Sequence, residues 1–221
     1  MLIVPLRRIA RILGEERYDV ILALCVAMVG LSATGVDALT AASGIVGLLL
    51  ITGTLIESSA LAVGRGKAWA LLAGLGCATA IELVVAGPDD ARIGPAIVAA
   101  IGAVAVAAIS RQVLLRPLPD TTSIAASACA YLLIGYSFAS LYILIDRIAS
   151  GSFLASGEAL TPESAIYFSF VTLTTLGFGD LTPAASSGRT LVTLEAMAGQ
   201  FYIAIAVARL VAGMATGRKD G

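Results

Sequence analysis

Six apolar stretches, each long enough to cross a lipid bilayer, dominate this sequence. They cover residues 19–36, 41–63, 68–87, 94–114, 122–148 and 188–213. A membrane-spanning helix needs about 20 mostly apolar residues and pairs its backbone polar groups internally. Of the 221 residues, 13% are charged, whereas a soluble domain carries about 25%. The sequence therefore predicts an all-α membrane protein with six transmembrane helices.

The residue types present exclude several kinds of catalytic site. The chain has no His, which excludes a His proton relay, a His metal site and a Ser–His hydrolase. Cys25, Cys77 and Cys129 all lie in apolar stretches and fit small core residues better than a disulfide framework. No acid–base pair or metal-ligand set is apparent, so we expect no enzyme activity and no cofactor. No basic cluster indicates a nucleic-acid partner.

The basic residues predict how the chain crosses the membrane. With six spans, both termini lie on one side, and all Lys and Arg residues except Arg92, Arg147 and Arg189 fall on that side. Loops rich in Lys and Arg stay in the cytoplasm. We therefore expect a multi-pass plasma membrane protein with cytoplasmic termini, and the long connection between the last two spans on the outside.

That connection contains an unusual motif at residues 172–180, with the sequence Thr-Leu-Thr-Thr-Leu-Gly-Phe-Gly-Asp. A ring of backbone carbonyls can replace the water around a cation when all of them point at one axis. Alternate glycines give backbone angles that Cβ atoms deny to other residues, and the Thr175 hydroxyl can add one more oxygen. The alternative is an ordinary Gly-rich loop between helices.

A short apolar run at 163–174 leads into the motif and cannot cross the membrane, so we expect a re-entrant helix. Thr161 can cap this helix, Pro162 suits its first turn, and Glu163 favours the positive end of the helix dipole. The opposite, negative end of the helix then points at the motif and favours a cation there.

Residues 175–180 resemble the signature of the potassium channel family, Thr-Val-Gly-Tyr-Gly-Asp, with Leu176 in place of Val and Phe178 in place of Tyr. The resemblance implies passive, potassium-selective conduction through a homotetrameric pore, with K⁺ as the permeant ion. It assigns the potassium-binding oxygens of the selectivity filter to Thr175, Leu176, Gly177 and Phe178, and Gly179 completes the filter. Two alternatives are a weakly selective cation channel and a non-conducting channel or transporter subunit.

Residues around the filter are expected to support it: Thr174, Asp180, Tyr167, Phe168, Val171 and Glu195. Glu195 is an ionisable residue within a span; it either pairs with a hydroxyl behind the filter, from Ser169 or Thr172, or contacts the ion. Some family members carry a Glu that pairs with the filter Asp where Val171 stands, and a Trp that holds the same Asp where Phe168 stands. We hypothesise from these departures, and from the missing hydroxyl of Phe178, a filter held mainly by packing, with altered inactivation.

The last span resembles the pore-lining inner helix of the family, and Gly199 matches its hinge glycine. A mid-helix Gly lowers the cost of bending, but it also allows close helix packing, and both roles stay open. Beyond Gly199, small apolar positions would line the inner mouth and allow closure by narrowing or dewetting. The candidate gate residues are Ile203, Val207 and Val211.

The arrangement of six spans with a pore between the last two resembles voltage-gated and cyclic-nucleotide-gated channels. Voltage sensing needs several charges in one helix, whereas the fourth span has only Arg111 and Arg116, both at its cytoplasmic end. We therefore expect little voltage dependence. Only about eight residues follow the last span, so we also expect no soluble regulatory domain. The predicted parts are an interfacial segment that can contact membrane lipids, a four-helix domain, a pore domain and a tail, at residues 1–17, 18–115, 120–215 and 216–221.

Overall fold

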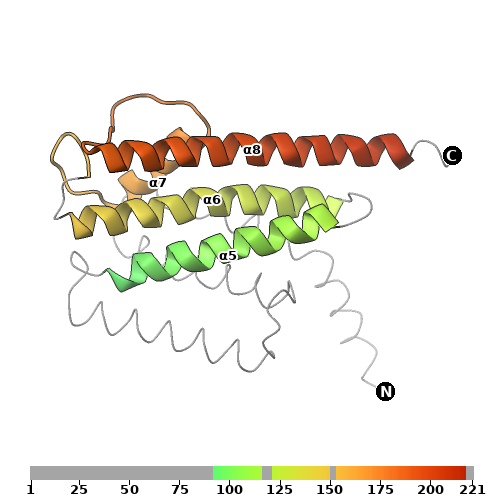
Figure 1. Ribbon diagram of the computed structural model, residues 1–221, viewed down its shortest axis with the longest axis horizontal. Helices are drawn as coiled ribbons and strands as arrows, with labels where there is room; N and C mark the ends of the chain where they lie inside the picture. Colours follow the sequence, from blue (N-terminus) through green and yellow to red (C-terminus); the bar gives the residue numbers. More distant parts are fainter. Residues whose placement is uncertain (1–91, 116–120, 150–152, 218–221) are drawn as a thin grey trace, which may run out of the picture.

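The computed structural model describes residues 92–115, 121–149 and 153–217, and their regular structure is helical throughout. The helices are α5 (Ile93–Leu115), α6 (Thr121–Ile148), α7 (Pro162–Leu173) and α8 (Ser186–Gly217) (Figure 1). The segment 1–17 and the first three predicted spans lie outside the described residues.

Three of the described helices are long and apolar enough to cross a membrane: Ile93–Arg111, Ile124–Ile148 and Ser186–Arg209. They correspond to the last three predicted spans, and α7 corresponds to the short re-entrant run. The chain is therefore a multi-pass membrane protein, and its described part is all-α.

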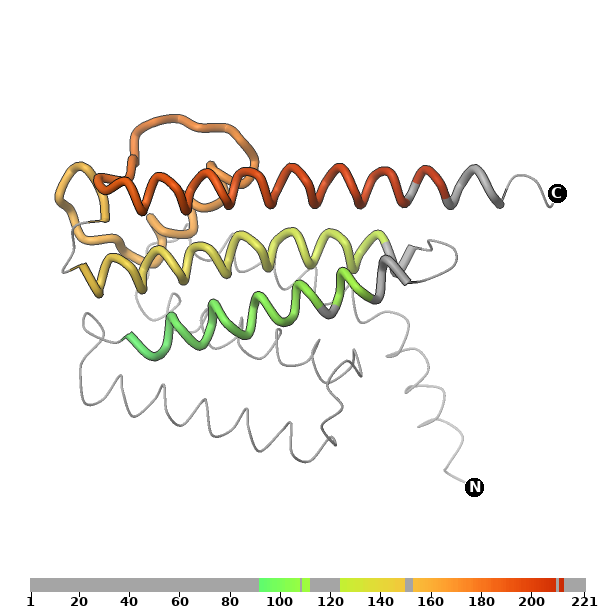
Figure 2. The backbone as a smooth tube through the Cα atoms, viewed as in Figure 1, coloured from blue at the N-terminus to red at the C-terminus, as the bar shows by residue number. Residues whose placement is uncertain are grey.

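Helices α5 and α6 form an antiparallel pair along most of their length (Figure 2). Their apolar contact is made by small and branched residues: Ala105, Ile109, Ala126, Ala130 and Leu133. Gly102 allows the closest approach, since a Cβ at this position would lie 2.0 Å from Ser137 Oγ. A methyl group at this position would have to displace the Ser137 hydroxyl and would crowd Ser137 Cβ, 3.2 Å away.

The short helix α7 begins where the sequence predicts. The Thr161 side chain accepts a hydrogen bond from the Ser164 N–H, and Ser164 Oγ accepts one from the Thr161 N–H. These reciprocal bonds satisfy two donors that a helix N-terminus leaves unpaired. Pro162 occupies the first turn with Glu163 beside it. All three residues that the sequence assigns to the start of this helix therefore lie at its start.

The connection from α6 to α7 is held by a carboxylate that sequence reasoning missed. Asp146 is 3% exposed, and its two oxygens accept hydrogen bonds from the N–H groups of Phe153 and Leu160, both at 3.0 Å. A bridge between Leu154 and Pro183 then joins this connection to the segment that precedes α8. The loops on both sides of α7 are thereby fixed to one another at the end of α6.

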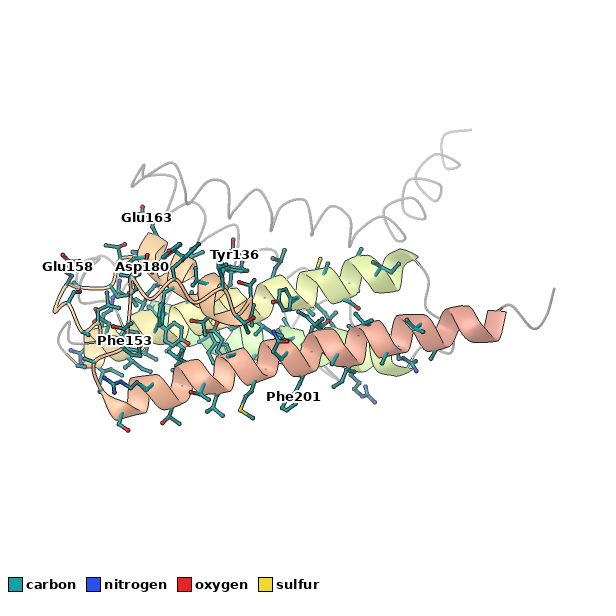
Figure 3. The ribbon with its side chains drawn as sticks, turned by 90° about the horizontal axis from the view of Figure 1, so that it is seen from above. Tyr136, Phe153, Glu158, Glu163, Asp180 and Phe201 are labelled. Carbon is teal, nitrogen blue, oxygen red and sulfur yellow. The ribbon has the colours of Figure 1, made fainter. Side chains whose placement is uncertain are left out.

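Helix α8 presents a long apolar surface that the rest of the described chain does not cover. The exposed positions include Leu194, Met197, Phe201, Ile205 and Val211. Phe201 points away from α6, on the outward side of α8 (Figure 3). An apolar helix face of this length is compatible with lipid or with further protein copies, and a single solvated chain would not stabilise it.

Candidate functional site

The motif after α7 has an unusual backbone. Thr175, Gly177 and Gly179 have positive φ angles of 60°, 58° and 79°. No other non-Gly residue in the described chain has a positive φ, so Leu176 and Phe178 have negative φ angles. Positive and negative φ angles therefore alternate from Thr175 to Gly179. A β-branched residue such as Thr rarely adopts this conformation, which costs about 1–3 kcal/mol and is typical of functional sites.

Hydrogen bonds fold the half of the motif nearest α7, residues 174–177, back onto the last turn of that helix. Thr175 N–H donates to Thr172 O at 2.9 Å. Leu176 N–H and Gly177 N–H both donate to Val171 O, at 2.9 and 3.3 Å. We call residues 174–177 the near half of the motif and residues 178–180 the far half.

These bonds determine where the near-half carbonyls point. The peptide bonds are trans, and in a trans peptide the N–H and C=O groups point in opposite directions. Because the three N–H groups face the end of α7, the carbonyls of Thr174, Thr175 and Leu176 face away from it. Residues 174–180 are exposed in the single chain. The three carbonyl oxygens therefore form a row on the side of the motif that faces away from α7, which we call the open side.

The far half is held by side chains instead. Tyr167 Oη donates a hydrogen bond to Asp180 Oδ2 at 2.7 Å. The ring of Tyr167 stacks on Phe178, with an interplanar angle of 7° and centroids 6.4 Å apart. The hydrogen bond lowers the pKa of the Asp180 carboxyl and raises the pKa of the Tyr167 hydroxyl, because it stabilises the carboxylate and the neutral phenol together.

These contacts correct the expectation of a filter held mainly by packing. Phe168 stands where some family members carry a Trp that holds the filter Asp. It is 5% exposed and packs on Tyr142 and Phe153, away from Asp180. The preceding aromatic residue, Tyr167, supplies the donor to Asp180. Val171 contributes its backbone carbonyl, which accepts hydrogen bonds from Leu176 N–H and Gly177 N–H.

The near half has two side-chain hydroxyls, on Thr174 and Thr175, and the first of them is hydrogen-bonded within the chain. Thr174 Oγ1 donates to Phe170 O at 2.6 Å, so the side chain is turned back onto α7. The oxygens available to a cation on the open side are therefore backbone carbonyls and the Thr175 hydroxyl, a ligand type suited to replacing the hydration shell of an ion.

Behind α7, Glu195 of α8 is completely buried, with an exposed fraction of 0%. Its carboxyl group contacts two hydroxyls: Tyr142 Oη donates to Oε2, and Ser169 Oγ is hydrogen-bonded to Oε1. Ser169 is one of the two partners that the sequence suggested. Tyr142 is 53 residues away in the chain, and only the tertiary structure brings it to Glu195.

Gly199 lies against the end of α7. A Cβ at this position would be 2.8 Å from Leu173 O and 2.7 Å from Leu173 Cδ1. Close packing therefore requires a glycine here, and a role as hinge stays a prediction. Leu173 O also accepts a hydrogen bond from Tyr131 Oη at 3.2 Å. The last turn of α7 is thus held from both α6 and α8.

The gate candidates occupy the exposed surface of α8. Ile203, Val207 and Val211 are 40%, 51% and 59% exposed, and their role stays a prediction. Between them and Gly199, Tyr202 points the other way: its Oη donates to Ser127 O at 3.0 Å, and the residue packs on the cluster that contains Ala105 and Ile109 of α5. A Tyr in an apolar stretch carried no sequence signal of this link between α8, α6 and α5.

Comparisons with known proteins cover this part of the chain. Residues 129–215 match a protein family described as "Ion channel". The chain is also 35% identical over 78 residues to the "Inward rectifier potassium channel Kirbac3.1" of Paramagnetospirillum magnetotacticum, an alignment that covers 33% of this chain and 26% of that protein. The chain therefore spans about a quarter of the length of this relative. No solved structure gives a significant match to the chain.

Proposed function

We propose that residues 129–215, which match a family described as "Ion channel", form the pore domain of a potassium channel, and that the chain conducts K⁺ passively through a pore built from four copies. The observation that carries the proposal is the direction of the near-half carbonyls. They face away from α7 on the exposed side of the chain, where a symmetric ring of copies would turn them toward one axis.

The assembly follows from what a single chain leaves incomplete. Leu176 and Phe178 are 57% and 64% exposed, an unfavourable state for apolar side chains beside an ion path. Neighbouring copies would cover these side chains while the carbonyls close a ring. The exposed apolar surface of α8 offers further contact area between copies and with lipid.

Electrostatics favours a cation at this place. The C-terminal end of α7 carries the partial negative charge of the helix dipole and ends at the motif. Asp180 stays ionised at the far end, because its hydrogen bond from Tyr167 lowers its pKa. A K⁺ ion would therefore exchange water for carbonyls of Thr175, Leu176, Gly177 and Phe178 along a path that is negative at both ends.

The experiment is reconstitution of the purified full-length chain in liposomes. We expect K⁺ flux and a reversal potential in mixed K⁺ and Na⁺ close to the potassium equilibrium value, with native mass spectrometry reporting a tetramer. A reversal potential near zero would favour the weakly selective cation channel instead. A tetramer without flux would favour a non-conducting subunit.

Orientation and gating belong to the same proposal. Both termini would lie in the cytoplasm of a plasma membrane protein, and the motif would face outward. We propose little voltage dependence and a closure point at the exposed face of α8 that contains Ile203, Val207 and Val211. A steep conductance–voltage relation would contradict the first of these statements.

A further inference from the structure

Three helices meet at the side chain of Glu195, which lies one turn before Gly199 on α8. Tyr142 of α6 donates to Oε2, and Ser169 of α7 is hydrogen-bonded to Oε1. Ser169 Oγ also lies 2.7 Å from the backbone oxygen of Gly135 on α6. The group is closed to solvent, since Glu195 and Ser169 are both 0% exposed.

The number of protons in this group constrains its charge. A Ser hydroxyl has one proton to donate, yet Ser169 Oγ contacts two oxygens that are acceptors if Glu195 is ionised: Gly135 O and Glu195 Oε1. One of these two close contacts would then hold no proton and would be repulsive. A protonated carboxyl removes the conflict, because its O–H donates to Ser169 Oγ and leaves the Ser169 proton for Gly135 O.

We infer that Glu195 is neutral in this conformation and that its carboxyl proton clamps α8 to α7 and α6 directly behind the filter. Oε1–H donates to Ser169, Ser169 donates to Gly135 O, and Oε2 accepts from Tyr142. Every polar atom of the group is then paired. Glu195 is a positioning residue, because it contacts the helix that supports the filter and none of the proposed ion ligands.

The surroundings of Glu195 agree with a neutral side chain. In the described part of the chain, the titratable groups that face it are Tyr142 and Tyr131, both from α6, while α7 presents the hydroxyl of Ser169. No Lys or Arg of these described segments forms an ion pair with it. Burying a carboxylate without a counter-charge is costly, whereas a hydrogen-bonded acid is tolerated.

Ionisation of Glu195 would therefore break the clamp. The single proton of Ser169 could then satisfy either the carboxylate or Gly135 O, and α8 would lose one of its links to α7. A lost hydrogen bond to a buried charged group corresponds to about a tenfold change in the clamped population. We expect conduction to fall when the pH is raised far enough to remove this proton; this consequence, unlike the charge state itself, rests on the proposed function.

The direct test is infrared spectroscopy of the full-length protein in lipid membranes at neutral pH. The difference spectrum between the wild type and Glu195→Gln should contain the carbonyl-stretch band of a protonated carboxyl group. Tyr142→Phe is the second variant: it removes the bond to Oε2, so the same band should remain and move to higher frequency. Absence of the band in the wild type would overturn the inference, and so would a band that Tyr142→Phe does not move.

The second readout is K⁺ flux as a function of pH. One amide N–H of Glu195→Gln can donate to Ser169, and its carbonyl can accept from Tyr142, so we expect flux within about twofold of the wild type at neutral pH. The alkaline fall in flux should disappear in this variant. A pH profile of Glu195→Gln that equals the wild-type profile would overturn the proposed regulation. If the protein conducts no ions at all, the infrared band still decides the charge state.

Discussion

The two halves of the motif are anchored by different kinds of bond. Residues 174–177 are fastened by backbone N–H groups to carbonyls of Val171 and Thr172, and no particular side chain is needed for those bonds. Residues 178–180 depend on side chains: Tyr167 donates to Asp180 and stacks on Phe178, and the other Asp180 oxygen accepts from the N–H of Leu181 at 3.0 Å. The near half is therefore sensitive to backbone conformation, and the far half to single side chains and to pH.

The largest effect is expected from a backbone change in the near half. Gly177 has a φ of +58°, and within one chain no atom lies within 4 Å of an added Cβ, so Gly177→Ala imposes backbone strain of about 1–2 kcal/mol in each copy. The result should be loss of K⁺ flux by more than about tenfold, since four strained copies share one ion path. Liposome flux measures it.

The chain offers a matched control for this substitution. Gly157 has a φ of +77° and equally open surroundings, but lies in the connection before α7. Gly157→Ala should impose the same local strain and leave flux unchanged. Equal losses in the two variants would show that general destabilisation, and not the conformation of the near half, sets the flux.

The next effect concerns the helix end to which the near half is bonded. Gly199→Ala would place a methyl group against Leu173 O and Cδ1, and such overpacking costs about 1–3 kcal/mol. Thermal unfolding of the reconstituted protein should therefore shift to lower temperature. If the unfolding temperature stays unchanged while channel opening is altered, Gly199 acts as a hinge and not as a packing site.

A smaller effect is expected from Tyr167→Phe, which keeps the ring over Phe178 and removes the donor to Asp180. Both groups are exposed, so we expect a rate of inactivation roughly two- to fivefold higher than in the wild type. Recordings from single channels or from liposome patches measure this rate. An unchanged rate would mean that the ring contact and the Leu181 N–H bond to Asp180 hold the far half without the Tyr167 hydroxyl.

The same bond gives the far half a pH dependence. Because the pKa of Asp180 is lowered, the contribution of the bond is fully present above the ordinary Asp pKa of about 3.9 and is lost as the pH falls through the lowered value. Tyr167→Phe removes the bond that lowers the pKa of Asp180, so protonation of Asp180, and any fall in flux that follows from it, should occur at higher pH than in the wild type. Flux measured as a function of external pH in the wild type and in Tyr167→Phe tests the direction of this shift.

The smallest effect is expected from Val171→Ala. Val171 supports the near half with its backbone oxygen, and Ala leaves that oxygen in place. Flux and inactivation should stay within about twofold of the wild type. A loss as large as that of Gly177→Ala would mean that side-chain packing holds the near half after all, which would remove the difference between the two halves.

Much of the architecture could be predicted because its signals are local. Thr161, Pro162 and Glu163 mark the start of α7, and apolar runs predict α5, α6 and α8 to within a few residues. The partner of Asp180 could not be predicted. Tyr167 and Phe168 are adjacent on one helix, and only the rotation of α7 against α6 decides which ring faces the motif. Tyr142 and Tyr131 likewise reach their partners across long separations in the chain.

The absence of a side chain at Gly102 brings α5 and α6 into close contact, so a movement of one helix affects the other. The side chain of Ser137 occupies the space that a Cβ at Gly102 would need, so this close contact resists sliding of α5 along α6. In the proposed tetramer, a displacement of α5 would be transmitted to α6 of the same subunit through this contact. Coordinated opening of the four subunits would then have to arise from contacts between copies, to which the exposed apolar surface of α8 can contribute.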